Sequence, residues 1–222
     1  MTKRGLSRER LADIAHGYVA EHGLDALTMR RLAAAAQVTP GALYKHLRDR
    51  RDLQRAMADT VFRSVDLSDI DPARPDLAQI ILCCERLRAA LLRFREGGRI
   101  VAGSYSPSPE TIRVASALMA LLRDVVAPGY GVGEVVLVLR SYITGFVIEE
   151  QSYLELSAAG EWDAVVARIA GEANPRPEGA EDLLAIMTGD RDRRFTAGLH
   201  TVLDGKVRDP ARAADRGLPR PA

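Results

Sequence analysis

Residues 28–51 read TMRRLAAAAQVTPGALYKHLRDRR, and this stretch predicts two short helices joined by a tight turn. Thr28 is suited to cap the first helix, because its hydroxyl can accept from backbone N–H groups that lack a helical partner. Thr39 is suited to cap the second helix. Pro40 fits the position after it, since the N–H that proline lacks would be unpaired there anyway. The stretch therefore favours a helix-turn-helix.

The second of these helices has two unlike sides. Leu43 and Leu47, four residues apart, turn one side inward, while the other side is small at its start and aromatic and basic further on. Arginines flank it with charge that suits phosphates, which favours a helix that enters the major groove of DNA. A helical hairpin that never touches nucleic acid is the alternative. The outward and flanking residues are Thr39, Gly41, Tyr44, Lys45, His46, Arg30, Arg48, Arg50 and Arg51.

Composition describes an ordinary globular chain whose charge is unevenly distributed. The 222 residues are 47% hydrophobic and 27% charged, with a net charge of +1. Residues 1–66 hold twelve Lys/Arg and eight Asp/Glu, whereas the remainder holds nineteen and twenty-two. A basic N-terminal part on a mildly acidic body is typical of a modular nucleic-acid binder. The length allows one large domain or two small ones.

Cysteines and apolar segments indicate a cytoplasmic protein. Cys83 and Cys84 are adjacent and are the only thiols, so a structural disulfide is not expected and a reducing compartment is. The N-terminus does not resemble a signal peptide. The most apolar stretch, 135–148, is interrupted by Arg140 and is too short to span a bilayer. We therefore expect no membrane partner.

Periodicity predicts an all-α fold with an N-terminal helix-turn-helix domain (1–63) and a C-terminal helical domain (77–206). Pro72 and Pro75 mark a linker between them, and the polar, proline-rich residues 207–222 should be disordered. Ser7 and Asp49 are suited to cap the first and fourth helices, and Gly23 to end the first. Helices are expected over 7–23, 28–36, 39–47, 49–63, 77–94, 110–126, 132–156, 160–171, 183–187 and 190–206, with one further turn at 99–103 and loops at 104–109 and 172–179.

The segment 132–156 is apolar on nearly every side. A helix apolar all round must be buried all round, and one protomer of this size has few elements left to cover it. Ser141, Thr144 and Gly145 would let another helix come close. We therefore expect this helix to pack against a second copy of the chain.

Residues 7–62 resemble the DNA-binding domain of the TetR family of bacterial transcription regulators. The matching segments read LTMRRLA at 27–33 and VTPGALYKHL at 38–47. The resemblance implies an operator-binding regulator, with repression as the family default. Ala36 and Gln37 stand where the family has a glycine-containing pair, which predicts a left-handed conformation at Gln37.

The resemblance also implies a role for each residue of the DNA surface. Arg30 would reach a guanine edge, where its planar fork matches two acceptors, and phosphate contacts would set the register. His46 belongs to the same predicted surface. The implied phosphate contacts are Thr28, Tyr44, Lys45 and Arg50, and the implied base contacts are Thr39, Pro40 and Gly41 besides Arg30.

The C-terminal part is similar to the tetracycline-repressor branch, through REGGRIVAGS at 95–104 and GFVIEEQ at 145–151. The resemblance implies an effector cavity in the helical body and a homodimer through helices 132–156 and 190–206. That branch holds a magnesium–drug chelate partly through a histidine, and Val101 stands at the aligned position. We therefore expect no metal or other cofactor and no recognition of magnesium–tetracycline.

A small, mostly apolar effector is the expected ligand of this body. Plain core packing is an equally good interpretation of any single residue. Two other function classes stay open: an effector-independent architectural DNA binder, and an α-helical enzyme with Glu149 and Glu150 as acid or base. Adjacent residues on a helix point in different directions, however, and Glu149 is expected to be a buried hydrogen-bonded group or a ligand contact. The expected ligand set is Cys83, Leu87, Val101, Ser104, Leu118, Ile143, Phe146 and Glu149.

Overall fold

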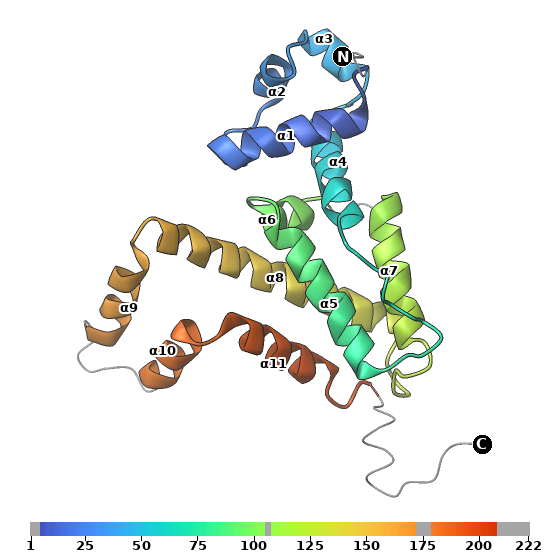
Figure 1. Ribbon diagram of the computed structural model, residues 1–222, viewed down its shortest axis with the longest axis vertical. Helices are drawn as coiled ribbons and strands as arrows, with labels where there is room; N and C mark the ends of the chain where they lie inside the picture. The colour runs from blue at the N-terminus through green and yellow to red at the C-terminus, as the bar shows by residue number, and fades with distance from the viewer. Residues whose placement is uncertain (1–4, 105–107, 172–178, 208–222) are drawn as a thin grey trace, which may run out of the picture.

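The computed structural model describes residues 5–104, 108–171 and 179–207, and these residues form an all-α fold, as predicted (Figure 1). Their one strand-like feature is an isolated antiparallel bridge between Val126 and Val207. Of the predicted loop at 172–179 and the predicted tail at 207–222, residues 172–178 and 208–222 lie outside the described residues. The helices are α1 (Arg8–His22), α2 (Met29–Ala35), α3 (Pro40–Tyr44), α4 (Arg50–Arg63), α5 (Leu77–Leu92), α6 (Gly97–Ala102), α7 (Pro109–Leu122), α8 (Val132–Ala158), α9 (Trp162–Gly171), α10 (Ala180–Thr188) and α11 (Arg191–Leu203).

Helices α1 to α4 form a small head, and side-chain caps fix where they begin. Ser7, Thr28, Thr39 and Asp49 each accept a hydrogen bond from the backbone N–H three residues further on, which satisfies donors that have no helical partner. All four predicted caps are confirmed. Gly23 ends α1 with a φ of 80°, as expected of a residue without a Cβ.

Helix α8 is the centre of the body below the head, and α5, α6, α7 and α11 pack against it (Figure 1). Its inner side is buried, including Leu139, Ile143 and Val147. Its outer side is not: Leu137 is 51% exposed and Val138 49% exposed. One protomer therefore leaves part of this apolar helix uncovered.

The turn between α5 and α6 places two glycines at the start of a helix. The helix predicted over 77–94 ends at Leu92, and Gly97 and Gly98 begin α6, of which only a turn at 99–103 was predicted. Glu96 adopts a left-handed conformation with a φ of 56°, and the chain then turns so tightly that a Cβ on Gly97 would collide with the carbonyl oxygen of Leu91. Glycine is thus required by the close approach of two backbones rather than by a helix end.

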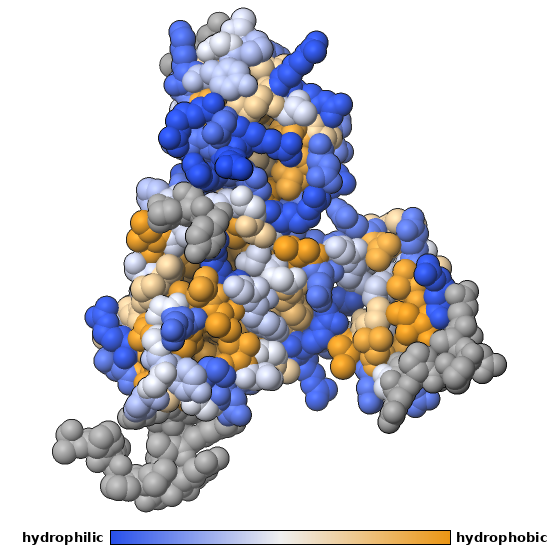
Figure 2. Space-filling model, turned by 180° about the vertical axis from the view of Figure 1, so that it is seen from behind, coloured by the Kyte–Doolittle hydropathy of each residue, from blue (hydrophilic) through white to orange (hydrophobic). Residues whose placement is uncertain are grey.

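Helices α9 and α10 form an arm that stands away from the body beyond the end of α8 (Figure 1). Leu183 and Ile186 on α10 are exposed. Figure 2 shows hydrophobic surface on this arm and on the body, whereas the head is mostly hydrophilic. The structure thus has a polar head and a body with apolar surface.

Candidate DNA-binding surface

Helices α2 and α3 bury one side and expose the other. Leu32, Leu43 and Leu47 are fully buried in the head, so the opposite side of α3 faces solvent. The structure brings the nine predicted DNA-contacting residues onto this outer side and the adjoining starts of α2 and α4. Eight of them are exposed, namely Thr28, Arg30, Thr39, Pro40, Gly41, Tyr44, Lys45 and Arg50, and His46 is half-buried.

The turn before α3 has the strain predicted for it. Gln37 has a φ of 55°, which is the left-handed region that a Cβ disfavours. Its N–H donates to the Ala34 carbonyl at 3.0 Å, and the N–H of Val38 donates to the Ala33 carbonyl at 3.0 Å. These bonds close the end of α2 and set the direction in which α3 leaves.

The basic residues around α3 divide into two groups. Arg31 Nη1 donates to the Ala26 carbonyl at 2.7 Å, and Arg8 and Arg48 bind the Asp52 carboxylate. Arg48, which looked from the sequence like a free phosphate-binding residue, is therefore occupied within the head. No hydrogen bond or ion pair within the described part of the chain engages the remaining basic residues, which are Arg30, Lys45, Arg50 and Arg51.

Asp52, which sequence reasoning missed, fastens the end of α3 to α1. Asp52 is 4% exposed. Its carboxylate accepts from the backbone N–H of Arg48 at 3.1 Å and from Arg8 at 2.8 Å. Burial alone would raise the pKa of Asp52, but the hydrogen bonds from Arg48 and Arg8 outweigh it and lower the pKa to about 2. The carboxylate is thus held charged between two arginines.

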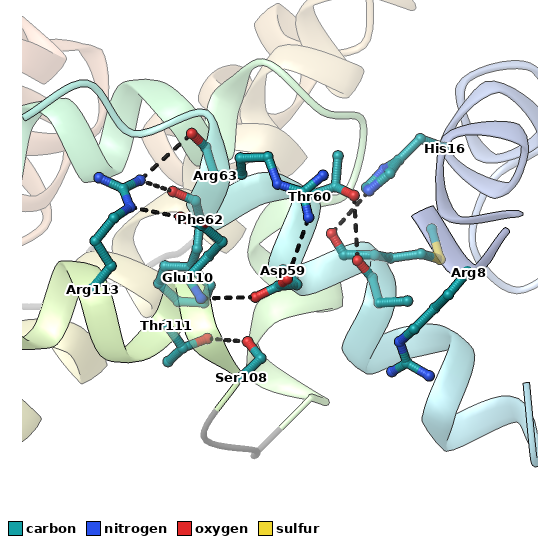
Figure 3. Close-up of polar contacts among 12 residues, drawn as sticks. Arg8, His16, Asp59, Thr60, Phe62, Arg63, Ser108, Glu110, Thr111 and Arg113 are labelled. Carbon is teal, nitrogen blue, oxygen red and sulfur yellow. Dashed lines mark hydrogen bonds and ion pairs between the residues drawn. The ribbon is translucent and has the colours of Figure 1, made fainter. Parts of the chain in front are cut away.

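Helix α4 connects the head to the body, because hydrogen bonds join it to residues of both (Figure 3). On the head side, His16 Nε2 donates to the Met57 carbonyl at 3.0 Å, and burial lowers the pKa of this histidine. On the body side, Arg113 of α7 donates to the Phe62 carbonyl at 2.9 Å. Asp59 accepts from the backbone N–H of Glu110 at 3.1 Å. Helices α7 and α4 are therefore joined by directional bonds.

Helix α6 makes a second connection between body and head. Glu96 Oε1 accepts from the backbone N–H of Leu24 at 2.6 Å, and Arg99 pairs with Asp25 at 2.9 Å. Both partners lie in the connection between α1 and α2. Gln54 of α4 donates to the Ile100 carbonyl at 3.3 Å, so α6 contacts two separate parts of the head.

The expected effector residues lie mostly in the core of the body. Seven of them are buried on α5, α6, α7 and α8 or directly after α6, namely Cys83, Leu87, Val101, Ser104, Leu118, Ile143 and Phe146. The Ser104 hydroxyl donates to the Val101 carbonyl at 2.8 Å, so it has a partner within the protein. Burial raises the pKa of the Cys83 thiol to about 11 and also raises that of Cys84.

One member of the set is placed differently from the expectation. Glu149 is exposed, so the expectation of a buried hydrogen-bonded group is wrong for it. The buried carboxylate is its neighbour Glu150, which is 5% exposed and binds Arg88. Adjacent positions on α8 face different surroundings, and the sequence offered no signal for which of the two pointed inward.

Two further observations bear on possible chemistry. Within the described residues, no group of three or more His, Cys, Asp or Glu side chains is arranged to hold a metal ion. None of the helices described is both long enough and apolar enough to cross a bilayer.

A short capped helix presented with its polar and basic side outward, above a helical body, defines a helix-turn-helix DNA-binding protein. Comparison with known proteins gives the family. The model described as bacterial regulatory proteins, tetR family, matches residues 11–57. The model described as tetracyclin repressor-like, C-terminal domain, matches residues 72–207. The chain belongs to the tetR family of bacterial regulatory proteins and is a DNA-binding transcriptional regulator.

Individual relatives agree with this assignment. The chain is 33% identical to the class A tetracycline repressor protein from transposon 1721 of Escherichia coli. The alignment spans 189 residues and covers 83% of each chain. A possible TetR family transcriptional regulator from Streptomyces coelicolor A3(2) superposes with a TM-score of 0.75 at 33% identity, over 94% of this chain and 100% of the other. BioQ, solved with its double-stranded DNA operator, superposes with a TM-score of 0.64 at 26% identity, over 90% and 98%.

Proposed function

We propose that this protein is a repressor that binds a palindromic operator as a homodimer and is released by a small, mostly apolar effector. The observation that carries the proposal is the outer side of α2 and α3, where exposed side chains stand over a fully buried set of leucines. Arg30, Lys45 and Arg50 are exposed and their side chains make no hydrogen bond or ion pair within the described residues, so they can contact phosphates and bases. The two α3 helices of a dimer would enter successive major grooves, about 34–36 Å apart.

The family resemblance implies a role for each residue of this surface, and the side-chain chemistry suits that role. Arg30 has the two-pronged geometry that reads guanine, and Thr39, Pro40 and Gly41 are small enough to let α3 approach base edges. Thr28, Tyr44, Lys45 and Arg50 surround them as phosphate contacts, with His46 beside them.

Gly41 gives the sharpest test of this arrangement. A Cβ at this position would meet nothing of the protein within 4 Å, so the fold itself has no need of glycine there. Alanine should keep the protein as stable or add up to about 1 kcal/mol through helix propensity. It should nevertheless weaken operator binding at least about tenfold, or 1.4 kcal/mol, by holding α3 away from the bases.

The experiment is fluorescence anisotropy with an operator fragment recovered by genomic selection, comparing the wild-type chain with Gly41→Ala. Gly17→Ala is a matched control, because a Cβ there also meets nothing within 4 Å, but Gly17 lies on the exposed side of α1, away from α3 and from the proposed dimer face. If Gly41→Ala binds the operator as tightly as the wild type, α3 does not approach the bases as proposed. Equal affinity for every duplex in a competition assay would favour the architectural DNA binder instead.

For the effector, we propose a site among the buried residues on α5 to α8, mostly apolar and with few hydrogen-bonding groups. Val101 lies on α6, whose first turn also holds the α1–α2 connection through Glu96 and Arg99. A ligand that displaces Val101 would therefore act on the helix that positions the head. To release the operator, the ligand needs only a higher affinity for the arrangement of the dimer's two heads that does not fit DNA than for the arrangement that does.

The donor set of this site does not suit magnesium–tetracycline. Val101 supplies no metal ligand where the tetracycline-repressor branch has a histidine, and a single carboxylate at Glu149 is a poor magnesium site. Calorimetry should detect no magnesium-dependent binding of tetracycline. An enzyme with paired carboxylates is equally unsupported, since Arg88 occupies the carboxylate of Glu150 while Glu149 faces solvent.

For the dimer, we propose an interface formed by α8 and α11. The exposed Leu137 and Val138 of α8 need a cover, and Ser141 and Gly145 follow them at four-residue spacing on the same exposed side. Small residues at these positions let a second helix come close.

A further inference from the structure

One arginine in the body joins three helices that are far apart in the sequence. Arg88 of α5 is 9% exposed. Its Nε donates to Glu150 Oε2 of α8 at 2.8 Å and its Nη2 to Oε1 of the same carboxylate at 2.5 Å. Its third nitrogen, Nη1, donates to Asp192 Oδ1 in the first turn of α11 at 2.7 Å. The guanidinium is thus shared between two carboxylates on two different helices.

Aromatic rings enclose the same guanidinium. Its central carbon lies 4.9 Å from the centre of the Phe195 ring and 5.4 Å from that of Phe146. These two rings meet edge to face at 5.1 Å. Taking charges out of water is costly, and replacing a buried ion pair by apolar side chains of similar volume is often neutral or stabilising. Stability is therefore a poor reason for a charge at this place.

Position is a better reason. The rings of Phe146 and Phe195 could pack in several registers, because apolar contacts have no direction. The bidentate bond to Glu150 and the bond to Asp192 allow only one placement of α11 along α8. The Tyr142 hydroxyl, which donates to the Phe195 carbonyl at 2.9 Å, lies at the same crossing. A Cβ on Gly198 would collide with this tyrosine, so the two helices already lie as close as their side chains allow.

We propose that Arg88 is a positioning residue for dimerisation: it fixes the register of α11 on α8 and so gives the face that binds a second copy its shape. This inference rests on the proposed interface through α8 and α11. The face consists of the exposed α8 residues Leu137, Val138, Ser141 and Gly145 and, on α11, of exposed Ala197 and Thr201 at four-residue spacing. The small side chains in this face, Ser141, Gly145, Ala197 and Thr201, complement a partner only if the two helices keep one spacing and one register.

The test replaces the pair with apolar side chains of similar size. In Arg88→Met with Glu150→Leu, no buried charge is left without a partner, and Asp192 remains in water, since its side chain is 86% exposed. We expect unchanged helical content by circular dichroism and a melting temperature at or above that of the wild type. In sedimentation equilibrium without DNA, we expect the dimer dissociation constant to rise at least about tenfold.

A matched control lies two residues away on the same helix. Arg86 also binds two carboxylates, Asp66 at 2.5 Å and Asp69 at 2.6 Å, but these lie between α4 and α5. Arg86→Met should leave the dimer dissociation constant unchanged. A double variant that dimerises as tightly as the wild type would overturn the proposal.

A single variant decides the question if the double variant does not fold. Asp192→Asn weakens only the bond between α11 and Arg88 and leaves the buried pair intact, and it should raise the dimer dissociation constant about threefold or more. An unchanged constant for this variant would also overturn the proposal. Because the measurement contains no DNA, a dimer that binds no duplex would refute the operator function alone.

Discussion

The head and the body of this protein use polar side chains in opposite ways. In the head, Arg30, Lys45 and Arg50 stand exposed and without protein partners, while the charge that stabilises the fold is concentrated on Asp52. In the body, the Arg88 guanidinium is buried where three helices meet and binds carboxylates on two of them. The head is built to leave groups free for a large polar partner, and the body to hold its helices in one arrangement.

The largest effect that follows from this contrast concerns Arg30. Arg30→Ala should weaken operator binding by about 1–3 kcal/mol and relax the preference at one base pair, because a free guanidinium is lost from the DNA surface. The neighbouring Arg31 is the matched control, since its guanidinium already donates to the Ala26 carbonyl. Anisotropy titrations on single-base operator variants measure both effects. Equal losses for Arg30→Ala and Arg31→Ala would remove the distinction between free and occupied arginines.

The next effect concerns the charge that holds the head together. Asp52→Asn should lower the free energy of unfolding by about 1–2 kcal/mol, because the charged bonds to Arg8 and Arg48 become neutral ones. The pKa of Asp52 is lowered on folding, so its contribution is fully present above the ordinary value of 3.8 and is lost as the pH falls towards about 2.

Urea unfolding of wild type and Asp52→Asn at several pH values measures this contribution. The two proteins should differ at pH 6 and converge below pH 3. A difference that stayed constant with pH would mean that the carboxylate is not the group responsible. Asp124→Asn is a control: this exposed aspartate follows α7 and its side chain makes no hydrogen bond or ion pair within the described residues, so its replacement should change the free energy of unfolding by less than about 0.5 kcal/mol at every pH.

These residues also mark where sequence reasoning succeeded and where it stopped. The four helix caps in the head follow from local chemistry, since each cap and its N–H partner are three residues apart. Asp52 also accepts a local bond, from the backbone N–H of Arg48 four residues before it. Its other partner, Arg8, is 44 residues away in the sequence. Nothing in the spacing of charges along the chain indicates that pairing. Arg48 was therefore interpreted as one of the arginines that flank the DNA surface, although it binds Asp52 within the head.

In the body, more of the contacts join residues that are distant in the sequence, so fewer of them could be predicted. The helices could be predicted from their apolar periodicity, and the apolarity of α8 indicated a second copy. Which of Glu149 and Glu150 turns inward depends on how α8 is rotated against α5, and the pairing of Arg88 with Glu150 spans 62 residues. Gly97 posed a similar problem, because the backbone that excludes a side chain there belongs to the preceding helix.

A smaller effect concerns the one strained residue in the helix-turn-helix. Gln37→Gly should raise the free energy of unfolding by about 0.5–1 kcal/mol, because glycine adopts the left-handed conformation of this turn without a steric cost. Thermal unfolding should show this as an increase of a few degrees in melting temperature. Gln54→Gly, in the interior of α4, should have the opposite sign. If Gln37→Gly destabilised the protein, a contact of the glutamine side chain would have to outweigh the strain.

The smallest expected effect lies in the body, where the two thiols should not react at all. The thiolate is the reactive form of cysteine, and burial raises the pKa of Cys83 to about 11 and that of Cys84 still further. At pH 8 the native protein should therefore resist labelling by iodoacetamide, whereas the urea-unfolded chain should take up two labels. Cys83→Ser and Cys84→Ser assign any slow reaction to one thiol. Rapid labelling of Cys83 in the native state would show that α5 opens to solvent. The contrast between an exposed polar surface on the head and a closed core in the body would then fail.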